Sequence, residues 1–182
     1  MKKIILKGPR LTLRPVKLVD APNFVRWFKD PEVARYIFPK LFRMSLFESK
    51  KYIKKALTHD DRLVYLIKAE DGNLVGITAV RLHSSDFIAN FEIIIGEKEY
   101  WGRGYAGECI KLIGDFVFKK LKYNRFELLV FVENKRAVKA YRKAGFKMEG
   151  QIRAKRLSRV DKKFHDEYMM SILRSEWLKK KK

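Results

Sequence analysis

Cysteine is nearly absent from this sequence, which has only Cys109 among its 182 residues. No disulfide can form within the chain, and such a composition is typical of a reducing compartment, so we expect a cytoplasmic protein. Long hydrophobic runs are also missing, and none approaches the roughly 20 apolar residues that a membrane-spanning helix needs. The opening MKKIILKGPR has only a short apolar run before Lys7, which does not predict a signal peptide. We therefore expect no membrane association.

Acidic residues are scarce: 21 Asp and Glu face 42 Lys and Arg, which gives a formal net charge of +21. This excess favours polyanionic surroundings such as nucleic acid, a phosphorylated ligand or an acidic membrane face. A solvated, lysine-rich surface of a heat-adapted protein is the alternative. With 47% hydrophobic and 35% charged residues the chain is expected to be globular, and its length suits one domain. Its three histidines and one cysteine form no metal-ligand spacing, so we expect no metal.

The hydrophobic pattern switches between the periods of strands and helices. Strands are expected over 10–16, 62–70, 73–83, 87–96, 125–133, 146–156 and 163–173. Helices are expected from an N-cap at Asp20 to Lys29, over 31–37, from a Ser45–Glu48 capping box to Leu57, over 106–121 and over 135–144. Asp71-Gly72 predicts a hairpin, and Gly145 predicts a helix end. The order predicts one α/β domain over 1–182, with a mixed, mostly antiparallel central sheet flanked by helices.

Few glycines are present, but three of the ten gather in EYWGRGYAGECI, residues 99–110, as a G-x-G-x-x-G motif. A glycine-rich turn between a strand and a helix N-terminus binds anions, because amide N–H groups converge there and the helix dipole adds positive charge. In a dinucleotide-binding Rossmann unit, Glu133 at the end of the next strand would be the ribose-binding acid. Against that interpretation, residues 97–101 separate the strand from the first glycine, and the motif follows an antiparallel meander.

A second motif follows the next expected strand: ENKRAVKAYRKAGF, residues 133–146. Together with WGRGYA (101–106) it resembles the GNAT acyl-CoA N-acetyltransferases. Their phosphate loop reads [Q/R]-x-x-G-x-[G/A], and their second signature reads N-x-x-A-x-x-x-Y-x-x-x-G-F. Trp101 replaces the leading Gln or Arg, as in the RimJ/RimL-like branch, which the opening stretches RLTLRPV and RWFKDPEVARYI also resemble. The resemblance spans nearly the whole chain and implies a GNAT fold with acetyl-CoA as the acetyl donor.

The resemblance also implies which residues bind the donor. The glycine loop would wrap the pyrophosphate, the end of strand 87–96 would pair with the pantetheine arm, and Arg103 would add a charge-assisted contact. The implied set is Ile94, Ile95, Gly96, Gly102, Arg103, Gly104, Tyr105, Ala106, Gly107, Asn134 and Ala137. Core packing is the alternative role for the isoleucines, and helix capping is the alternative for Asn134.

The resemblance implies that Tyr141 donates a proton to the thioester sulfur. The alternative is that Tyr141 is a buried tyrosine of the core. We expect Glu92 to be the base, because a carboxylate interrupts an apolar strand there and a strand glutamate holds the amine in the similar spermidine/spermine acetyltransferases. In the RimJ/RimL-like branch the acid more often stands at the position of Asn90. The alternatives are an ion pair of Glu92 with Arg81, a water-mediated base, His83 as the base, or no dedicated base for an acceptor amine of low pKa. Two further histidines, His59 and His165, are expected at the surface, and Cys109 in the core.

The acceptor amine is expected first to be a protein N-terminus, as in ribosomal-protein acetyltransferases, because the basic surface repels free polyamines and suits an RNA-rich particle. A small-molecule amine (a polyamine, an aminoglycoside or an amino acid) is the alternative. A non-catalytic basic module that binds RNA is the rival from another class. A homodimer is compatible with the resemblance, because dimers are common in this fold.

Overall fold

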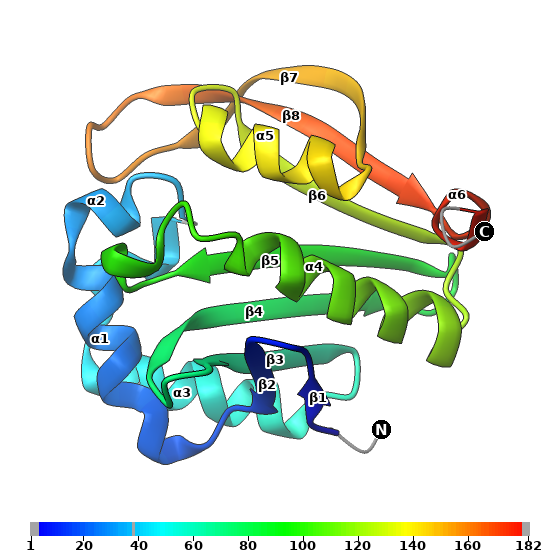
Figure 1. Ribbon diagram of the computed structural model, residues 1–182. Helices are drawn as coiled ribbons and strands as arrows, with labels where there is room; N and C mark the ends of the chain where they lie inside the picture. Colours follow the sequence, from blue (N-terminus) through cyan, green and yellow to red (C-terminus); the bar gives the residue numbers. More distant parts are fainter. Residues whose placement is uncertain (1–3, 38, 180–182) are drawn as a thin grey trace.

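The computed structural model describes residues 4–37 and 39–179. In these residues a single sheet of eight strands runs through the molecule in the order β1-β2-β3-β4-β5-β6-β8-β7 (Figure 1). The strands are β1 (Leu6–Lys7), β2 (Leu11–Pro15), β3 (Arg62–Ala69), β4 (Leu74–His83), β5 (Ile88–Ile95), β6 (Arg125–Phe131), β7 (Lys147–Leu157) and β8 (Phe164–Leu173). All neighbouring strands are antiparallel except β5 and β6, which are parallel. The predicted α/β fold with a mixed, mostly antiparallel sheet is confirmed.

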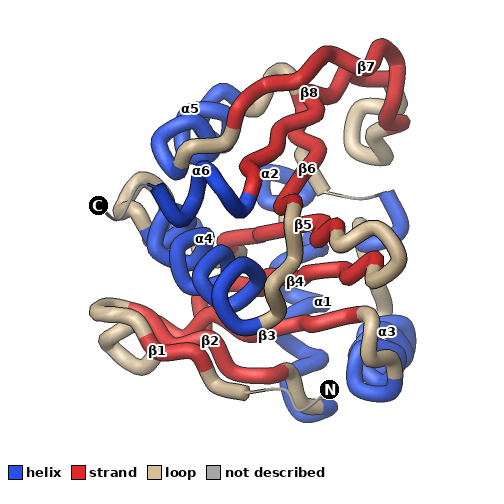
Figure 2. The backbone as a smooth tube through the Cα atoms, turned by 90° about the vertical axis from the view of Figure 1, so that its right-hand side faces the viewer, coloured by secondary structure: helices blue, strands red, loops and turns tan. Residues whose placement is uncertain are grey.

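Helices cover both faces of the sheet, with α4 and α5 on one face and α1 and α3 on the other (Figure 2). Their bounds are η1 (Leu18–Asp20), α1 (Ala21–Lys29), α2 (Pro31–Ala34), η2 (Pro39–Leu41), α3 (Leu46–Thr58), η3 (Lys98–Tyr100), α4 (Tyr105–Asp115), the π-helical turn η4 (Phe116–Lys120), α5 (Lys135–Ala144) and α6 (Arg174–Lys179). In the described residues, no helix has the length and apolar character needed to cross a bilayer.

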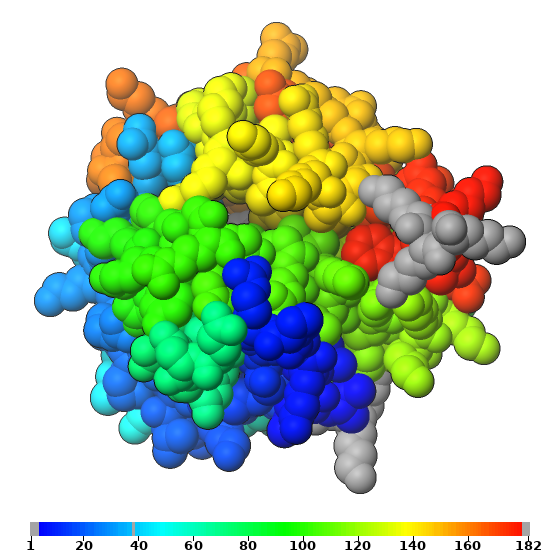
Figure 3. All heavy atoms as spheres, in the orientation of Figure 1, coloured from blue at the N-terminus to red at the C-terminus, as the bar shows by residue number. Residues whose placement is uncertain are grey.

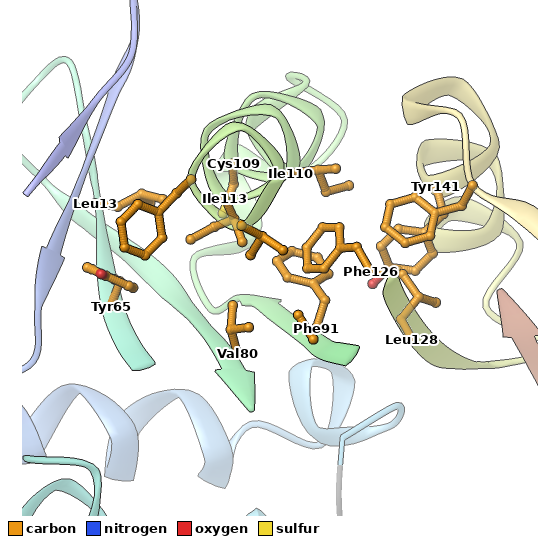
Figure 4. Close-up of a cluster of buried hydrophobic side chains, with 14 of the residues drawn as sticks. Leu13, Tyr65, Val80, Phe91, Cys109, Ile110, Ile113, Phe126, Leu128 and Tyr141 are labelled. Atoms are coloured by element: carbon orange, nitrogen blue, oxygen red, sulfur yellow. The ribbon is translucent and has the colours of Figure 1, made fainter. Parts of the chain in front are cut away.

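Each face of the sheet has its own hydrophobic core. Under α4 and α5, residues such as Ile110, Phe91 and Phe126 interlock (Figure 4). On the opposite face, Phe24 and Trp27 of α1 pack against β3 and β4. Because neighbouring side chains of a strand point to opposite faces, β5 contributes Phe91, Ile93 and Ile95 to the first core and Ile94 to the second.

Local signals in the sequence set several helix ends as predicted. The Ser45–Glu48 capping box is present, with the Glu48 amide donating to Ser45 Oγ at 3.2 Å and the Ser45 amide donating to Glu48 Oε2 at 2.8 Å. Asn134 caps α5 by accepting a bond from the Ala137 amide at 3.2 Å. Gly145 ends α5 with φ +102°, a left-handed conformation that favours glycine.

Other local predictions were wrong. Asp20 does not cap α1, because the 3-10 turn η1 leads directly into that helix and Asp20 already has a helical backbone. Its carboxylate instead accepts from the Lys17 amide at 2.7 Å and pairs with Arg14 at 2.7 Å. Helix α2 ends at Ala34 rather than at residue 37, and the short elements β1 and α6 were not predicted. They are too short to show a hydrophobic period.

The parallel pair β5–β6 separates after a short stretch. Only Ile88–Asn90 pair with Arg125–Glu127, whereas β6 continues along β8 as far as Phe131. Residues 91–95 of β5 therefore have no strand partner on the β6 side, and the two strands diverge as Figure 1 shows. The space-filling view shows a narrow opening between the green atoms around the start of α4 and the yellow atoms of α5 (Figure 3).

Candidate active site

The glycine motif forms the turn that leads into α4. Gly102 and Gly104 have φ values of +77° and +85°, in the left-handed region that favours glycine. Within the described chain, the amide N–H groups from Gly102 to Gly107 donate to no acceptor, and α4 has no side-chain cap. A Cβ added at Gly102 or Gly107 would meet no atom within 4 Å, so this loop faces open space. Free amides at the positive end of a helix can hold a phosphate group.

Arg10 holds the loop from behind. Its guanidinium donates to the Arg103 carbonyl at 3.0 Å and to Glu108 Oε2 at 3.1 Å. Glu108 Oε1 also accepts from the Arg10 and Leu11 amides, at 2.8 and 3.2 Å, which ties the first turn of α4 to β2. The Arg103 guanidinium lies over the Tyr100 ring, 5.3 Å from its centroid, and the residue lines a surface cavity of about 640 Å³.

Trp101, at the position where the family motif has Gln or Arg, links three parts of the candidate site. Its indole N–H donates to the Ile95 carbonyl at 2.8 Å, and the Arg136 guanidinium of α5 lies 3.8 Å from its ring centroid. Gly96 is required for packing as well, because a Cβ there would lie 2.2 Å from Trp27. Trp101 therefore fixes the end of β5, the glycine loop and α5 relative to one another.

Tyr141 projects from α5 into the first core, next to the open part of β5 (Figure 4). It is 7% exposed and packs edge-on against Phe91 with 6.5 Å between ring centroids. Burial raises the pKa of the phenol, and the charges of Cys109 and Glu92 raise it further. Its hydroxyl has no hydrogen-bond partner in the described part of the chain, so it is available to a bound molecule.

Glu92 points to the opposite face of β5, where it is half-buried. Burial is the largest influence and raises the pKa of its carboxyl, while the charges of Arg62, Lys40, Arg81 and Arg156 act in the other direction. Among the described residues no hydrogen bond or ion pair reaches the carboxylate, so the alternative of a structural pair with Arg81 is not observed.

Asn90, His83 and Cys109, the other residues considered near the site, have different environments from that of Glu92. Asn90 donates to Glu127 Oε1 at 2.5 Å, which occupies its amide. His83 is exposed at the end of β4. Cys109 is fully buried, as expected, and burial raises the pKa of its thiol to about 12.

His165, expected at the surface, is partly buried in β8. Only 17% of its side chain is exposed, and its two ring nitrogens contact Glu133 at 3.2 Å and Asp161 at 2.9 Å. His59 is exposed, and its Nδ1 contacts the Lys55 carbonyl at 2.9 Å. Across residues 4–37 and 39–179, no three His, Cys, Asp or Glu side chains gather in a way that could hold a metal ion.

Three cationic residues near Glu92 were not predicted from the sequence: Lys40, Arg62 and Arg156. Lys40 lies on η2, whereas Arg62 begins β3 and Arg156 lies in β7. They act on Glu92 only because the sheet order and the packing of η2 bring distant segments together. No local motif marks them.

The comparisons with known proteins agree with this geometry. A family model described as the acetyltransferase (GNAT) domain matches residues 10–147. The chain belongs to the GNAT family and is an N-acetyltransferase with the single-domain GNAT fold.

Two curated relatives are similar over most of the chain. The chain is 31% identical over 141 residues to spermidine N(1)-acetyltransferase of Escherichia coli (strain K12), covering 77% of this chain and 74% of that protein. It is 27% identical over 175 residues to the uncharacterized N-acetyltransferase p20 of Bacillus licheniformis, covering 92% and 95%. The RimJ/RimL-like branch stays a prediction.

A solved structure shares the fold. Spermidine N-acetyltransferase from Vibrio cholerae, in complex with CoA and spermine, superimposes with a TM-score of 0.85 at 26% identity, covering 94% of this chain and 99% of that one. The predicted contact with RNA and the predicted homodimer stay predictions.

Proposed function

We propose that this chain transfers the acetyl group of acetyl-CoA to the primary amine of a small molecule at the opening between β5 and β6. The observation that carries the proposal is the divergence of these strands between the buried phenol of Tyr141 and the half-buried carboxylate of Glu92, in a chain of the GNAT family. The relatives named as spermidine acetyltransferases support a small-molecule acceptor. They give no such support to a protein N-terminus, the acceptor expected first from the sequence.

The residues of the glycine loop suit the donor. The free amides of Gly102–Gly107 and the dipole of α4 would hold its pyrophosphate, as the sequence predicts. The Gly96 amide donates to Val75 in β4 at 2.8 Å. Because backbone groups alternate in direction along a strand, Ile93 and Ile95 direct theirs to the open edge and Ile94 directs its own toward β4. The backbone groups of Ile93 and the amide of Ile95 would then pair with the pantetheine arm, since the Ile95 carbonyl already accepts from Trp101.

Acetyl-CoA, when bound, supplies an activated thioester, and the side chains of the chain move the protons. Glu92 takes a proton from the acceptor ammonium, and the free amine attacks the acetyl carbonyl carbon. A C–N bond forms and the C–S bond breaks, while Tyr141 donates a proton to the leaving sulfur. Burial raises the pKa of Glu92, which makes it a stronger base, and raises that of Tyr141, which keeps the phenol protonated at neutral pH. The ammonium loses two protons overall: one ends on sulfur and the other is released to water.

The test measures the CoA thiol released with a panel of polyamines, aminoglycosides, amino acids and peptides with free N-termini. Saturable turnover with a small amine supports the proposal. Turnover with peptides alone would assign the acceptor to protein N-termini. In parallel, calorimetric titration with acetyl-CoA and with NADH tests the donor. We expect acetyl-CoA to bind and NADH to be silent; the reverse would return the glycine loop to the dinucleotide interpretation and make Glu133 the residue to examine.

A further inference from the structure

Two arginines stand side by side on the face of the sheet that carries Glu92. The strand register places Arg62 of β3 opposite Arg81 of β4, and Arg81 opposite Asn90 of β5. Glu92 is the next residue of β5 on that face, diagonal to Arg81. Diagonal neighbours lie about 7–8 Å apart, within reach of long side chains. The arginine row therefore borders the proposed base.

Neither arginine has a carboxylate hydrogen-bond partner among the described residues, unlike Arg14, Arg125 and Arg156 of the same sheet. Arg62 donates to the Tyr52 hydroxyl at 2.7 Å and lies over its ring, 4.6 Å from the centroid. Arg81 has no hydrogen bond or ion pair with any residue that the structure describes. By contrast, Arg156 forms two bonds of 3.1 Å to the buried Glu167. Like charges that face each other across two strands are destabilising. An anion bound beside Arg62 and Arg81 would therefore reduce the repulsion between their guanidinium groups.

A third cation approaches from outside the sheet. Lys40 of η2 lies close enough that the charges of Arg62 and Arg81 lower its pKa, after the larger effect of burial, while Glu92 raises it. Positive charge from Lys40, Arg62 and Arg81 thus acts on Glu92, and the nearby Arg156 pairs with Glu167. A polycation that placed one ammonium at Glu92 would bring its remaining charges against this cluster.

We infer that the acceptor is a primary amine carrying an anionic group, a carboxylate or a phosphate, a few bonds from its nitrogen. The inference rests on the proposed function and narrows its substrate class. The ammonium lies at Glu92 and the anion at Arg81, with Arg62 and Lys40 behind it. A guanidinium offers paired N–H donors whose spacing matches carboxylate and phosphate oxygens, and such charged hydrogen bonds are stronger than neutral ones. An amino acid has both groups, an ammonium that would bind Glu92 and a carboxylate that would bind Arg81.

The experiment compares acceptors that differ only in the anion. Ornithine and putrescine share the same chain and differ by one carboxylate; O-phosphoethanolamine and ethanolamine differ by one phosphate. We expect kcat/KM, from CoA release, to be at least about tenfold higher for the anionic member of one pair, as a charged hydrogen bond predicts. The pair with the larger ratio identifies carboxylate or phosphate. Equal values in both pairs, or a preference for putrescine and spermidine, would overturn the inference.

Variants assign the preference to Arg81. In Arg81→Gln the KM of the anionic amine should rise by about tenfold or more, while the matched amine without the anionic group keeps its KM or binds more tightly. Because Arg81 is exposed, the variant is expected to fold. Arg153→Gln on β7 is the matched control, since Arg153 is also exposed and is not among the main charges that act on Glu92. An equal change in both variants would overturn the assignment.

The proposed function and this inference fail in different ways. Turnover with polyamines but not with anionic amines would leave the proposed function standing and refute the inference. Turnover with peptides alone, or with no amine although acetyl-CoA binds, would refute both.

Discussion

Replacement of Glu92 by glutamine removes the proposed base and keeps the size and shape of the side chain. In the described structure no hydrogen bond or ion pair of the Glu92 carboxylate is lost, so the fold should tolerate the change. A positioned general base contributes about 10²–10⁴ in rate. We therefore expect kcat/KM of Glu92→Gln to fall by about 100-fold or more at neutral pH, with unchanged affinity for acetyl-CoA.

The pH dependence separates a base from a residue that only shapes the site. Burial raises the pKa of Glu92 above its usual 4.5, so the wild-type kcat/KM should rise with pH through that raised value and then level off. In the variant only the amine that is already neutral reacts. An alkyl amine has a pKa of about 10.4, so kcat/KM should climb about tenfold per pH unit toward that value, and the gap to wild type should narrow.

The assay follows CoA thiol release from neutral to alkaline pH, with calorimetric titration of acetyl-CoA on the same preparations. Asp86→Asn is the control, because it removes a carboxylate from the exposed turn between β4 and β5. If Glu92→Gln keeps the wild-type rate and pH profile, Glu92 is not the base. A constant loss at every pH would assign it to substrate positioning.

Three further predictions follow from the same structure. Tyr141→Phe should lower kcat by about 100-fold without weakening acetyl-CoA binding, since the phenol has no partner among the described residues; an unchanged kcat would point to another proton donor. Gly104→Ala should destabilise the fold by about 1–2 kcal/mol in urea unfolding and weaken acetyl-CoA binding, because φ is +85° there; a neutral result in both measurements would contradict the loop geometry. Asp161 and then Glu133 raise the pKa of His165 above 6.5, so its contribution to stability is full below pH 6.5 and is lost as pH rises through the folded pKa. The difference in unfolding free energy between wild type and His165→Gln should shrink accordingly, and a difference that is constant with pH would refute the linkage.

Most of the fold was predictable because its signals are local. The capping box at Ser45–Glu48, the hairpin at Asp71-Gly72 and the helix end at Gly145 each depend on a few consecutive residues, and the structure has all three. The prediction that Asp20 caps α1 was wrong, because its carboxylate instead binds the Lys17 amide and the Arg14 side chain. The divergence of β5 and β6 has no local signal in the sequence, since strand pairing is decided by distant segments.

In the candidate site, too, the residues within contiguous motifs were predicted, whereas those brought together by the fold were not. The glycine loop and the Asn134–Tyr141 helix are contiguous motifs, so the sequence predicted them. The cationic cluster around Glu92 arises from the register of β3, β4 and β5 and from the packing of η2, and no spacing in the sequence shows it. The partners of His165 have no local signal either, because Glu133 and Asp161 reach it from the turn after β6 and from the turn before β8.

The most direct test of the central claim is to identify the product by mass spectrometry after the wild-type protein is incubated with acetyl-CoA and a small primary amine. The account predicts an amine heavier by one acetyl group, with the acetyl group on nitrogen and an equal amount of free CoA. Release of CoA without an acetylated amine, or transfer to no small amine although acetyl-CoA binds, would contradict it.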